Sequence, residues 1–188
     1  MLEEIIQKCI LQVRRECSFF GSLMLFAKIE KSNDLPTAAT DGRKIFFNEE
    51  FLNSLSSPQQ NALMLHEVLH MALLHVTRRQ SRDPYIWNIA ADIVVNDLIE
   101  RNTSFSLPEG AITDNRFQDK SVEYIYEALL KSKKKYNLVI SDILQPSNSN
   151  SDESNNDSKD VMEPLSQEET DEIESFWKDK MEILKNSS

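Results

Sequence analysis

All three histidines of this 188-residue chain lie within ten residues of one another, at His66, His70 and His75. The residues around them follow the apolar spacing of a helix, and a helix turns by about 100° per residue. His66 and His70 are four residues apart, so both imidazoles point from the same face and can bind one metal ion. The fold is therefore expected to bring a third protein ligand to that face.

Glu67 completes the pattern His-Glu-x-x-His, which is typical of zinc metallopeptidases. Its side chain lies about 100° round the helix from His66, beside the metal position rather than on it. From there it can take a proton from water that zinc has acidified and deliver it to a leaving amine. The motif predicts Zn²⁺ as the cofactor, His66 and His70 as ligands and Glu67 as the catalytic base. The alternative is a helix with two unrelated histidines and a chance glutamate.

Asp92 is the predicted third ligand. It lies in the apolar run Ile89 to Val95, where an uncompensated carboxylate would be costly to bury and a metal ion would relieve that cost. Asn88 and Asn96 lie one turn to either side and are expected to orient the carboxylate or a histidine by hydrogen bonds. The alternative is that Asp92 forms an ion pair with Arg78 or Arg79.

His75 is the other candidate for the third ligand. It follows His66 by nine residues, about 900° of rotation, so in a continuous helix it would lie on the opposite side. It could reach the metal only if the helix broke after His70, and the interval lacks the glycine at which the metzincin arrangement breaks its helix. His75 is therefore expected to end the helix or to support a ligand.

The apolar periodicity predicts an α+β fold with a small antiparallel sheet packed on a helical core. Serine or aspartate followed by proline, at Ser57-Pro58 and Asp83-Pro84, marks the start of two helices. The second of these is apolar nearly all the way round and belongs in the core. The expected helices cover about residues 2–17, 57–76, 85–100, 121–130 and 166–184, and the expected strands cover 23–29 and 44–47.

Two segments lack the regular apolar periodicity of a helix or strand. Residues 103–120 contain several turn formers and are expected to form a long ordered loop, which in a compact domain is usually functional. Residues 146–164 are poor in apolar side chains and are predicted to be a flexible acidic linker. The chain is thus divided into a domain over 1–145, this linker, and an amphipathic helix over 165–188. Phe176 and Trp177 are expected to dock that helix onto the domain or onto a partner.

The composition excludes some functions. Acidic residues outnumber basic ones by 31 to 21, and the resulting net charge of -10 argues against nucleic acid as a ligand. The N-terminus lacks the pattern of a secretion signal, and no stretch approaches the ~20 apolar residues that span a bilayer. We expect a cytoplasmic protein that binds no membrane. Cys9 and Cys17 are too far apart on one helix for a disulfide and are expected to be free thiols.

Three stretches of the chain form a specific combination of motifs: Pro36 to Arg43 (PTAATDGR), His66 to His75 (HEVLHMALLH) and Trp87 to Asn96 (WNIAADIVVN). Together they resemble the metallopeptidase domain of bacterial VWA-like proteins. Leu107 to Ala111 and the helix around Tyr126 also match, so that the resemblance covers about residues 1–132. It implies a zincin-like fold around the HExxH helix. Because the family's domain commonly precedes a VWA-like domain and is encoded near MoxR-type AAA ATPases, it also implies a VWA-like protein or such an ATPase as a partner.

Two functions remain open on the sequence. The first is a zinc peptidase that hydrolyses an amide bond of a protein or peptide, with the strand at 44–47 offering its edge to the substrate. Four residues are candidates for stabilising the oxyanion: Tyr85, Tyr124, Tyr126 and Arg116. The second is a zinc-containing, catalytically silent module that recruits clients to an AAA ATPase or a VWA-like protein.

Overall fold

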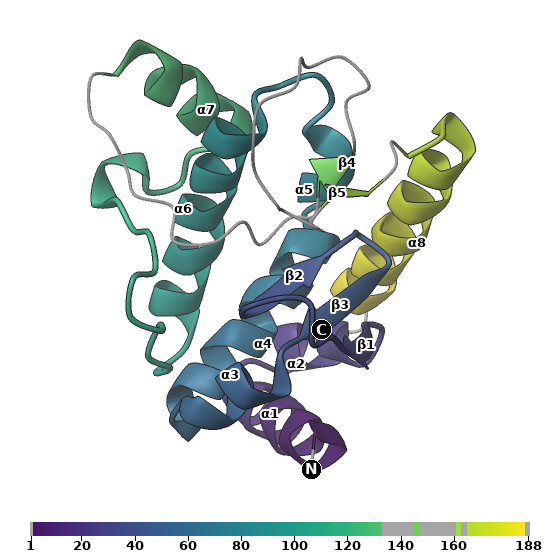
Figure 1. Cartoon of the computed structure of the whole chain (residues 1–188), viewed down its shortest axis with the longest axis vertical. Coiled ribbons are helices and arrows are strands. Elements are labelled where there is room, and N and C mark those ends of the chain that lie inside the picture. Colours follow the sequence, from purple (N-terminus) through teal and green to yellow (C-terminus); the bar gives the residue numbers. More distant parts are fainter. Residues whose placement is uncertain (1, 133–144, 147–160, 163–164, 187–188) are drawn as a thin grey trace.

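The computed structural model describes residues 2–132, 145–146, 161–162 and 165–186 (Figure 1). In chain order its elements are α1 (Leu2–Glu16), α2 (Ser18–Met24), β1 (Lys28–Lys31), β2 (Ala38–Thr40), β3 (Lys44–Phe47), α3 (Glu49–Ser54), α4 (Ser57–Ala72), α5 (His75–Arg78), α6 (Pro84–Asn102), the short 3₁₀ helix η1 (Asn115–Phe117), α7 (Val122–Lys131), β4 (Gln145–Pro146), β5 (Val161–Met162) and α8 (Gln167–Asn186). Helix α4 runs through the middle, with α6 and α7 on one side and α8 on the other (Figure 1).

The sheet is small, as predicted, but it is mixed rather than antiparallel. Its order is β1-β3-β2, with β2 antiparallel and β1 parallel to β3. Gly42, with φ of 89°, makes the tight turn between β2 and β3. The strand predicted over 23–29 is also wrong, because its first residues end helix α2 and β1 starts only at Lys28. A short apolar run has no period that distinguishes a buried strand from a buried helix end.

Helix α4 is the buried centre of the fold. Its N-terminus carries a capping box, in which the backbone N–H of Ser56 donates to Gln59 Oε1 over 3.1 Å, so the cap lies one residue before the predicted Ser57. Every residue from Asn61 to Ala72 is buried. The helix ends earlier than its apolar pattern predicts, because Leu74 adopts a left-handed conformation with φ of 61°. The short helix α5 then begins at His75.

Helix α6 starts where the sequence predicts and packs against both α4 and α7. The carboxylate of Asp83 caps it by accepting the backbone N–H of Ile86 at 2.9 Å. Trp87 and Ile93 pack with α7 residues such as Ile125 in a second apolar cluster, separate from the larger cluster around α4. Asp92 and Asn96 of α6 face His66 of α4 in the interior, and this seam contains the site described below.

Helix α8 docks back onto the rest of the chain. Ile173 and Trp177 are buried in the larger apolar cluster, and Trp177 Nε1 donates to the carbonyl of Gly42 over 3.2 Å. Arg43, in the same turn, forms ion pairs with Glu169 and Glu172 of α8. Of the two aromatic residues predicted to dock this helix, Trp177 packs on the domain and supports the β2–β3 turn, whereas Phe176 is 42% exposed. Most of the predicted linker over 146–164 lies outside the described residues, and the described pairs Gln145–Pro146 and Val161–Met162 form a two-stranded parallel ladder.

Within the described ranges, no helix combines the length and apolar character that crossing a bilayer requires.

Candidate metal centre

Two helices bring His66, His70 and Asp92 together in the interior. The Nε2 atoms of His66 and His70 on α4 lie 2.8 Å apart. Asp92 Oδ1 on α6 lies 3.3 Å from Nε2 of His70 and 3.8 Å from Nε2 of His66. A tetrahedral ion with ligand bonds of 2.0–2.2 Å has its ligand atoms roughly 3.3 Å apart. The donor set and its spacing thus fit one small metal ion held by two imidazoles and a carboxylate.

The ring of His66 is oriented from behind by Asn96. Asn96 Nδ2 donates to the carbonyl of Ile112 over 2.9 Å, so its Oδ1 faces His66 Nδ1, also at 2.9 Å. An amide oxygen can only accept, and His66 Nδ1 must therefore carry the ring hydrogen. The lone pair of His66 Nε2 is left facing the other two candidate ligands, which is the tautomer a metal ligand needs.

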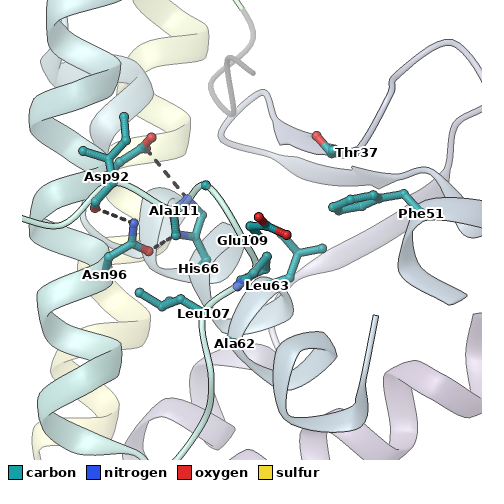
Figure 2. Close-up of a pocket in the computed structure, with 13 residues that line it drawn as sticks. Thr37, Phe51, Ala62, Leu63, His66, Asp92, Asn96, Leu107, Glu109 and Ala111 are labelled. Carbon is teal, nitrogen blue, oxygen red and sulfur yellow. Dashed lines mark hydrogen bonds and ion pairs between the residues drawn. The ribbon is translucent and has the colours of Figure 1, made fainter. Parts of the chain in front are cut away.

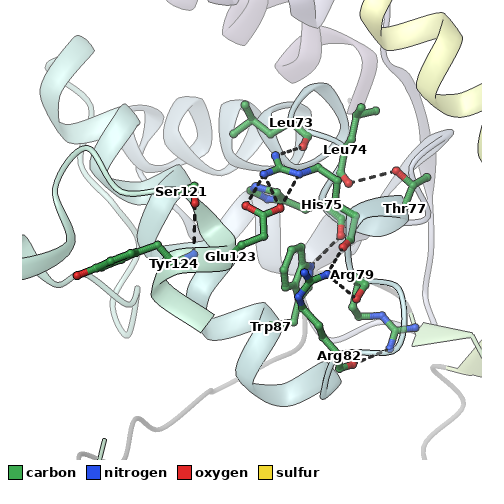
Figure 3. A network of polar contacts seen from close by, with 11 residues as sticks. Leu73, Leu74, His75, Thr77, Arg79, Arg82, Trp87, Ser121, Glu123 and Tyr124 are labelled. Carbon is green, nitrogen blue, oxygen red and sulfur yellow. Dashed lines mark hydrogen bonds and ion pairs between the residues drawn. The ribbon is translucent and has the colours of Figure 1, made fainter. Parts of the chain in front are cut away.

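His70 is supported by His75. The break at Leu74 turns α5 back, so that His75 Nδ1 lies 3.1 Å from His70 Nδ1 rather than on the far side of the helix. The opposite position applied only to a continuous helix, and the break at Leu74 ends α4 before His75. His75 contacts His70 at Nδ1, whereas Nε2 of His70 faces His66 and Asp92. The backbone carbonyl of His75 accepts the Nε1–H of Trp87 at 2.8 Å (Figure 3).

Burial keeps these rings neutral. Loss of solvation, followed by the charges of His66 and His75, holds the pKa of His70 well below its usual value of 6.5. Loss of solvation, followed by the nearby charges of Arg78 and His66, lowers the pKa of His75 to about 3. Neutral imidazole is the form that coordinates a metal ion.

The two arginines that the sequence offered as ion-pair partners for Asp92 contact other residues in the structure. Arg78 instead forms a forked ion pair with Glu123 of α7, with contacts of 2.7 and 2.8 Å from Nη2 (Figure 3). Arg79 donates to the carbonyl of Arg82 over 3.4 Å. Asp92 Oδ1 lies close to the two histidines, 3.3 Å from Nε2 of His70 and 3.8 Å from Nε2 of His66.

A pocket of about 150 Å³ opens beside this cluster (Figure 2). His66 and Asp92 form part of its wall, and the loop over residues 107–112 covers another part. The long loop predicted to be functional thus lines the pocket. Sequence reasoning missed Thr37, Phe51 and Leu63, which also line it and which stand in patterns that indicate only packing or a strand start.

The remaining predicted site residues do not line this pocket. Glu67 is fully buried on α4 and is not among the residues that line the pocket, while Asn88 is buried one turn before Asp92 on α6. The four oxyanion candidates do not line the pocket either. Tyr85 and Tyr124 are at least half exposed, and Tyr126 accepts the backbone N–H of Asp83.

Comparison with known proteins places the chain in a family. Over 126 residues it is 29% identical to a Thermotoga maritima protein described as "Uncharacterized protein", a match covering 60% of this chain and 32% of that relative. The match thus spans about a third of the relative's length. No solved structure matches the chain. Residues 3–185, which include the candidate metal centre, match the family described as "Putative metallopeptidase domain", and the chain belongs to that family.

Proposed function

We propose that the protein is a zinc-dependent peptidase that hydrolyses an amide bond of a protein or peptide. One observation carries the proposal: the two histidines of an HExxH helix and a buried aspartate converge at metal-ligand spacing beside a pocket. Family membership supports the same class of reaction. The HExxH helix and the resemblance to domains of VWA-like proteins lead us to propose a zincin-like fold as well.

Zinc is the ion that best suits this donor set. Two imidazoles and one carboxylate are a usual catalytic zinc set, whereas Mg²⁺ and Ca²⁺ prefer oxygen ligands alone. A structural zinc site closes its fourth position with a protein ligand. Among the described residues the candidate group contains three, His66, His70 and Asp92, which leaves room for water or substrate.

A bound zinc ion would supply Lewis acidity, which lowers the pKa of water and polarises the amide carbonyl. The protein's own residues do the rest. Burial holds the pKa of His70 well below its usual value, and the Nε2 atoms of His66 and His70 both face the site. Glu67 takes a proton from the water as the water oxygen bonds to the amide carbon. It passes this proton to the nitrogen of the leaving amine as the C–N bond breaks, so that the carboxylate is restored at the end of the cycle.

The substrate strand cannot pair with β3, as the sequence analysis expected, because β3 is the central strand and both its edges are occupied. The outer edge of β2 is the alternative. Ala39 pairs with Phe46 of β3, so the backbone groups of its neighbours Ala38 and Thr40 point toward that outer edge. Thr37, directly before β2, lines the pocket, and an extended peptide beside β2 would therefore pass the metal centre.

A second candidate function is a zinc-holding module without turnover, which recruits clients to a MoxR-type AAA ATPase or a VWA-like protein. The burial of Glu67 away from the pocket wall favours it. These partners and a cytoplasmic location rest on the resemblance and on the sequence pattern.

Cleavage profiling distinguishes the two functions. The zinc-loaded wild type and the Glu67→Gln variant are each incubated with a proteome, and new peptide termini are identified by mass spectrometry. A peptidase produces cuts with the wild type alone, although both proteins contain equal zinc. If the two profiles match, the protein is not a peptidase of this mechanism. Glu127→Gln, an exchange of the same kind on α7, is the matched control and keeps the wild-type profile.

A further inference from the structure

The pocket beside the metal centre is polar at one end and apolar along its wall. His66, Asp92 and Asn96 form the polar end. The apolar part of the wall combines side chains from three parts of the chain: Phe51 of α3, Ala62 and Leu63 of α4, and Leu107, Pro108, Ala111 and Ile112 of the loop. Thr37 and the exposed Glu109 also line the pocket. In Figure 2 the loop residues Leu107 and Ala111 lie close to His66, across the pocket from Phe51. An apolar wall that begins at a metal ligand is placed to contact the part of a substrate next to the reacting bond.

We propose that this pocket is the subsite for one apolar side chain of the substrate, at the residue directly beside the scissile amide. The inference rests on the proposed peptidase function and adds a substrate class to it. An apolar cavity of about 150 Å³ holds a benzene molecule. The pocket, at about 150 Å³, therefore accepts a side chain of the size of leucine or phenylalanine.

Smaller and charged side chains fit less well for separate reasons. Alanine leaves most of the volume unfilled and loses the contacts that a larger side chain makes with Phe51 and Leu63. Aspartate carries a charge into an apolar wall, and the acidic residues that line the pocket, Asp92 and Glu109, would repel it. The subsite consequently selects a large apolar residue over both.

Asn96 anchors the loop that forms part of the pocket wall. Asn96 contacts His66 through Oδ1 and the carbonyl of Ile112 through Nδ2, so one amide positions both a candidate ligand and the loop. The loop also contains its own turn, in which the backbone N–H of Ala111 donates to the carbonyl of Pro108 over 3.2 Å. Gly110 has φ of 88°, which suits glycine at this turn. These contacts fix the distance between the apolar wall and the metal centre.

The test uses zinc-binding probes that carry one side chain each. N-acetylated hydroxamates of leucine, phenylalanine, alanine and aspartate are titrated calorimetrically into the zinc-loaded full chain. The hydroxamate anchors each probe at the metal, and the side chain reports on the pocket. We expect the leucine and phenylalanine probes to bind at least about tenfold more tightly than the alanine probe, and the aspartate probe to bind most weakly.

Two substitutions change the pocket in opposite directions. Ala111→Leu, on an exposed loop position, fills the space and should reduce the preference for leucine over alanine to about twofold or less. Leu63→Ala enlarges it and should shift the preference toward phenylalanine. Leu130→Ala on α7 is the matched control, since Leu130 is half exposed and does not line the pocket, and it should leave all affinities unchanged.

The possible outcomes test the subsite, the peptidase function and the metal site separately. If zinc is present and all four probes bind equally, or if Ala111→Leu changes nothing, the subsite is refuted while the metal site stands. If the probes rank as expected and no peptide is cleaved, the pocket binds an apolar side chain beside the metal but the peptidase is refuted, and with it the position beside a scissile amide. If elemental analysis finds no metal after zinc loading, the metal site and the subsite that depends on it fail together.

Discussion

The Nδ1 atoms of His70 and His75 lie 3.1 Å apart in the protein interior. One nitrogen must therefore donate a hydrogen and the other must accept it. If His70 Nε2 is to offer a lone pair to a metal ion, the hydrogen lies on His70 Nδ1 and His75 accepts it. His75 thereby fixes the tautomer of a ligand without touching the metal position, as carboxylates or carbonyls do behind other metal-binding histidines.

Zinc content distinguishes a proposed ligand, such as Asp92, from His75, which is proposed to support a ligand. Asp92→Ala removes a ligand and should abolish stoichiometric zinc binding, as His66→Ala and His70→Ala should. His75→Ala leaves the three ligands and should keep one zinc per chain, with an affinity about 10–100-fold lower. Elemental analysis and competition with a chelator measure both effects. Loss of zinc in the His75 variant alone would show that the ligand set is wrongly assigned.

Acid should destabilise the metal-free protein. The folded-state pKa of His75 is about 3, against a usual value of 6.5, and that of His70 is lowered in the same direction. Between these values the unfolded chain binds protons that the folded chain does not, so stability is full above about pH 6.5 and falls as the pH falls toward 3. Each such histidine contributes a slope of about 1.4 kcal/mol per pH unit.

Urea unfolding of the chelator-treated protein at pH 5, 6, 7 and 8 measures this slope. The midpoint should be nearly constant from pH 7 to 8 and lower at pH 6 and 5. The variant His75→Asn has one fewer buried imidazole and should show a shallower decline. A midpoint that does not change between pH 5 and 7 would contradict the neutral, buried state of these rings.

The helices could be predicted because their signals are local. Asp83 and Ser121 cap α6 and α7 where the sequence places them, and Asp92 was identified from the cost of burying a carboxylate in an apolar helix. The position of His75 could not be derived in this way. It depends on the left-handed conformation of Leu74, which no glycine or asparagine signals in the sequence.

The sheet and the pocket depend on contacts between distant segments. The parallel pairing of β1 with β3 joins Lys28 to Lys44, and periodicity does not specify the direction of pairing. Leu63 has the pattern of an ordinary core residue in the sequence, and only the fold places it beside His66 and the loop. Residues that act through such contacts have no local signature.

Trp177 should contribute strongly to the stability of the whole domain. It is almost fully buried against the core, and its indole N–H bonds to Gly42. Trp177→Ala should lower the free energy of unfolding by about 3–5 kcal/mol. Phe176→Ala, at the adjacent and partly exposed position, should cost less than half as much. Thermal and urea unfolding compare the two variants directly.

Removing residues 146–188 should have a larger effect than either substitution. The division of the sequence into a domain over 1–145, a linker and a separate helix predicts that this truncation leaves a folded core. Because Ile173 and Trp177 pack in the main apolar cluster, we now expect the truncated chain to unfold at a lower temperature and to expose apolar surface. Dye binding and light scattering report this exposure. Unchanged stability of the truncated chain would show that α8 contributes little to the domain.

Asn96 offers a test of how the metal centre and the pocket are joined. Asn96→Leu keeps a side chain of similar size but loses the hydrogen bonds to His66 and to the carbonyl of Ile112. His66 can then adopt the wrong tautomer, and zinc affinity should fall about 10–100-fold. The loop should also exchange its amide hydrogens faster, since its anchor to α6 is gone. Asn102→Leu, at the exposed end of the same helix, should change neither property. If Asn96→Leu weakened zinc binding while exchange in residues 107–112 stayed the same, Asn96 would orient the ligand alone and the loop would be held by its own turn.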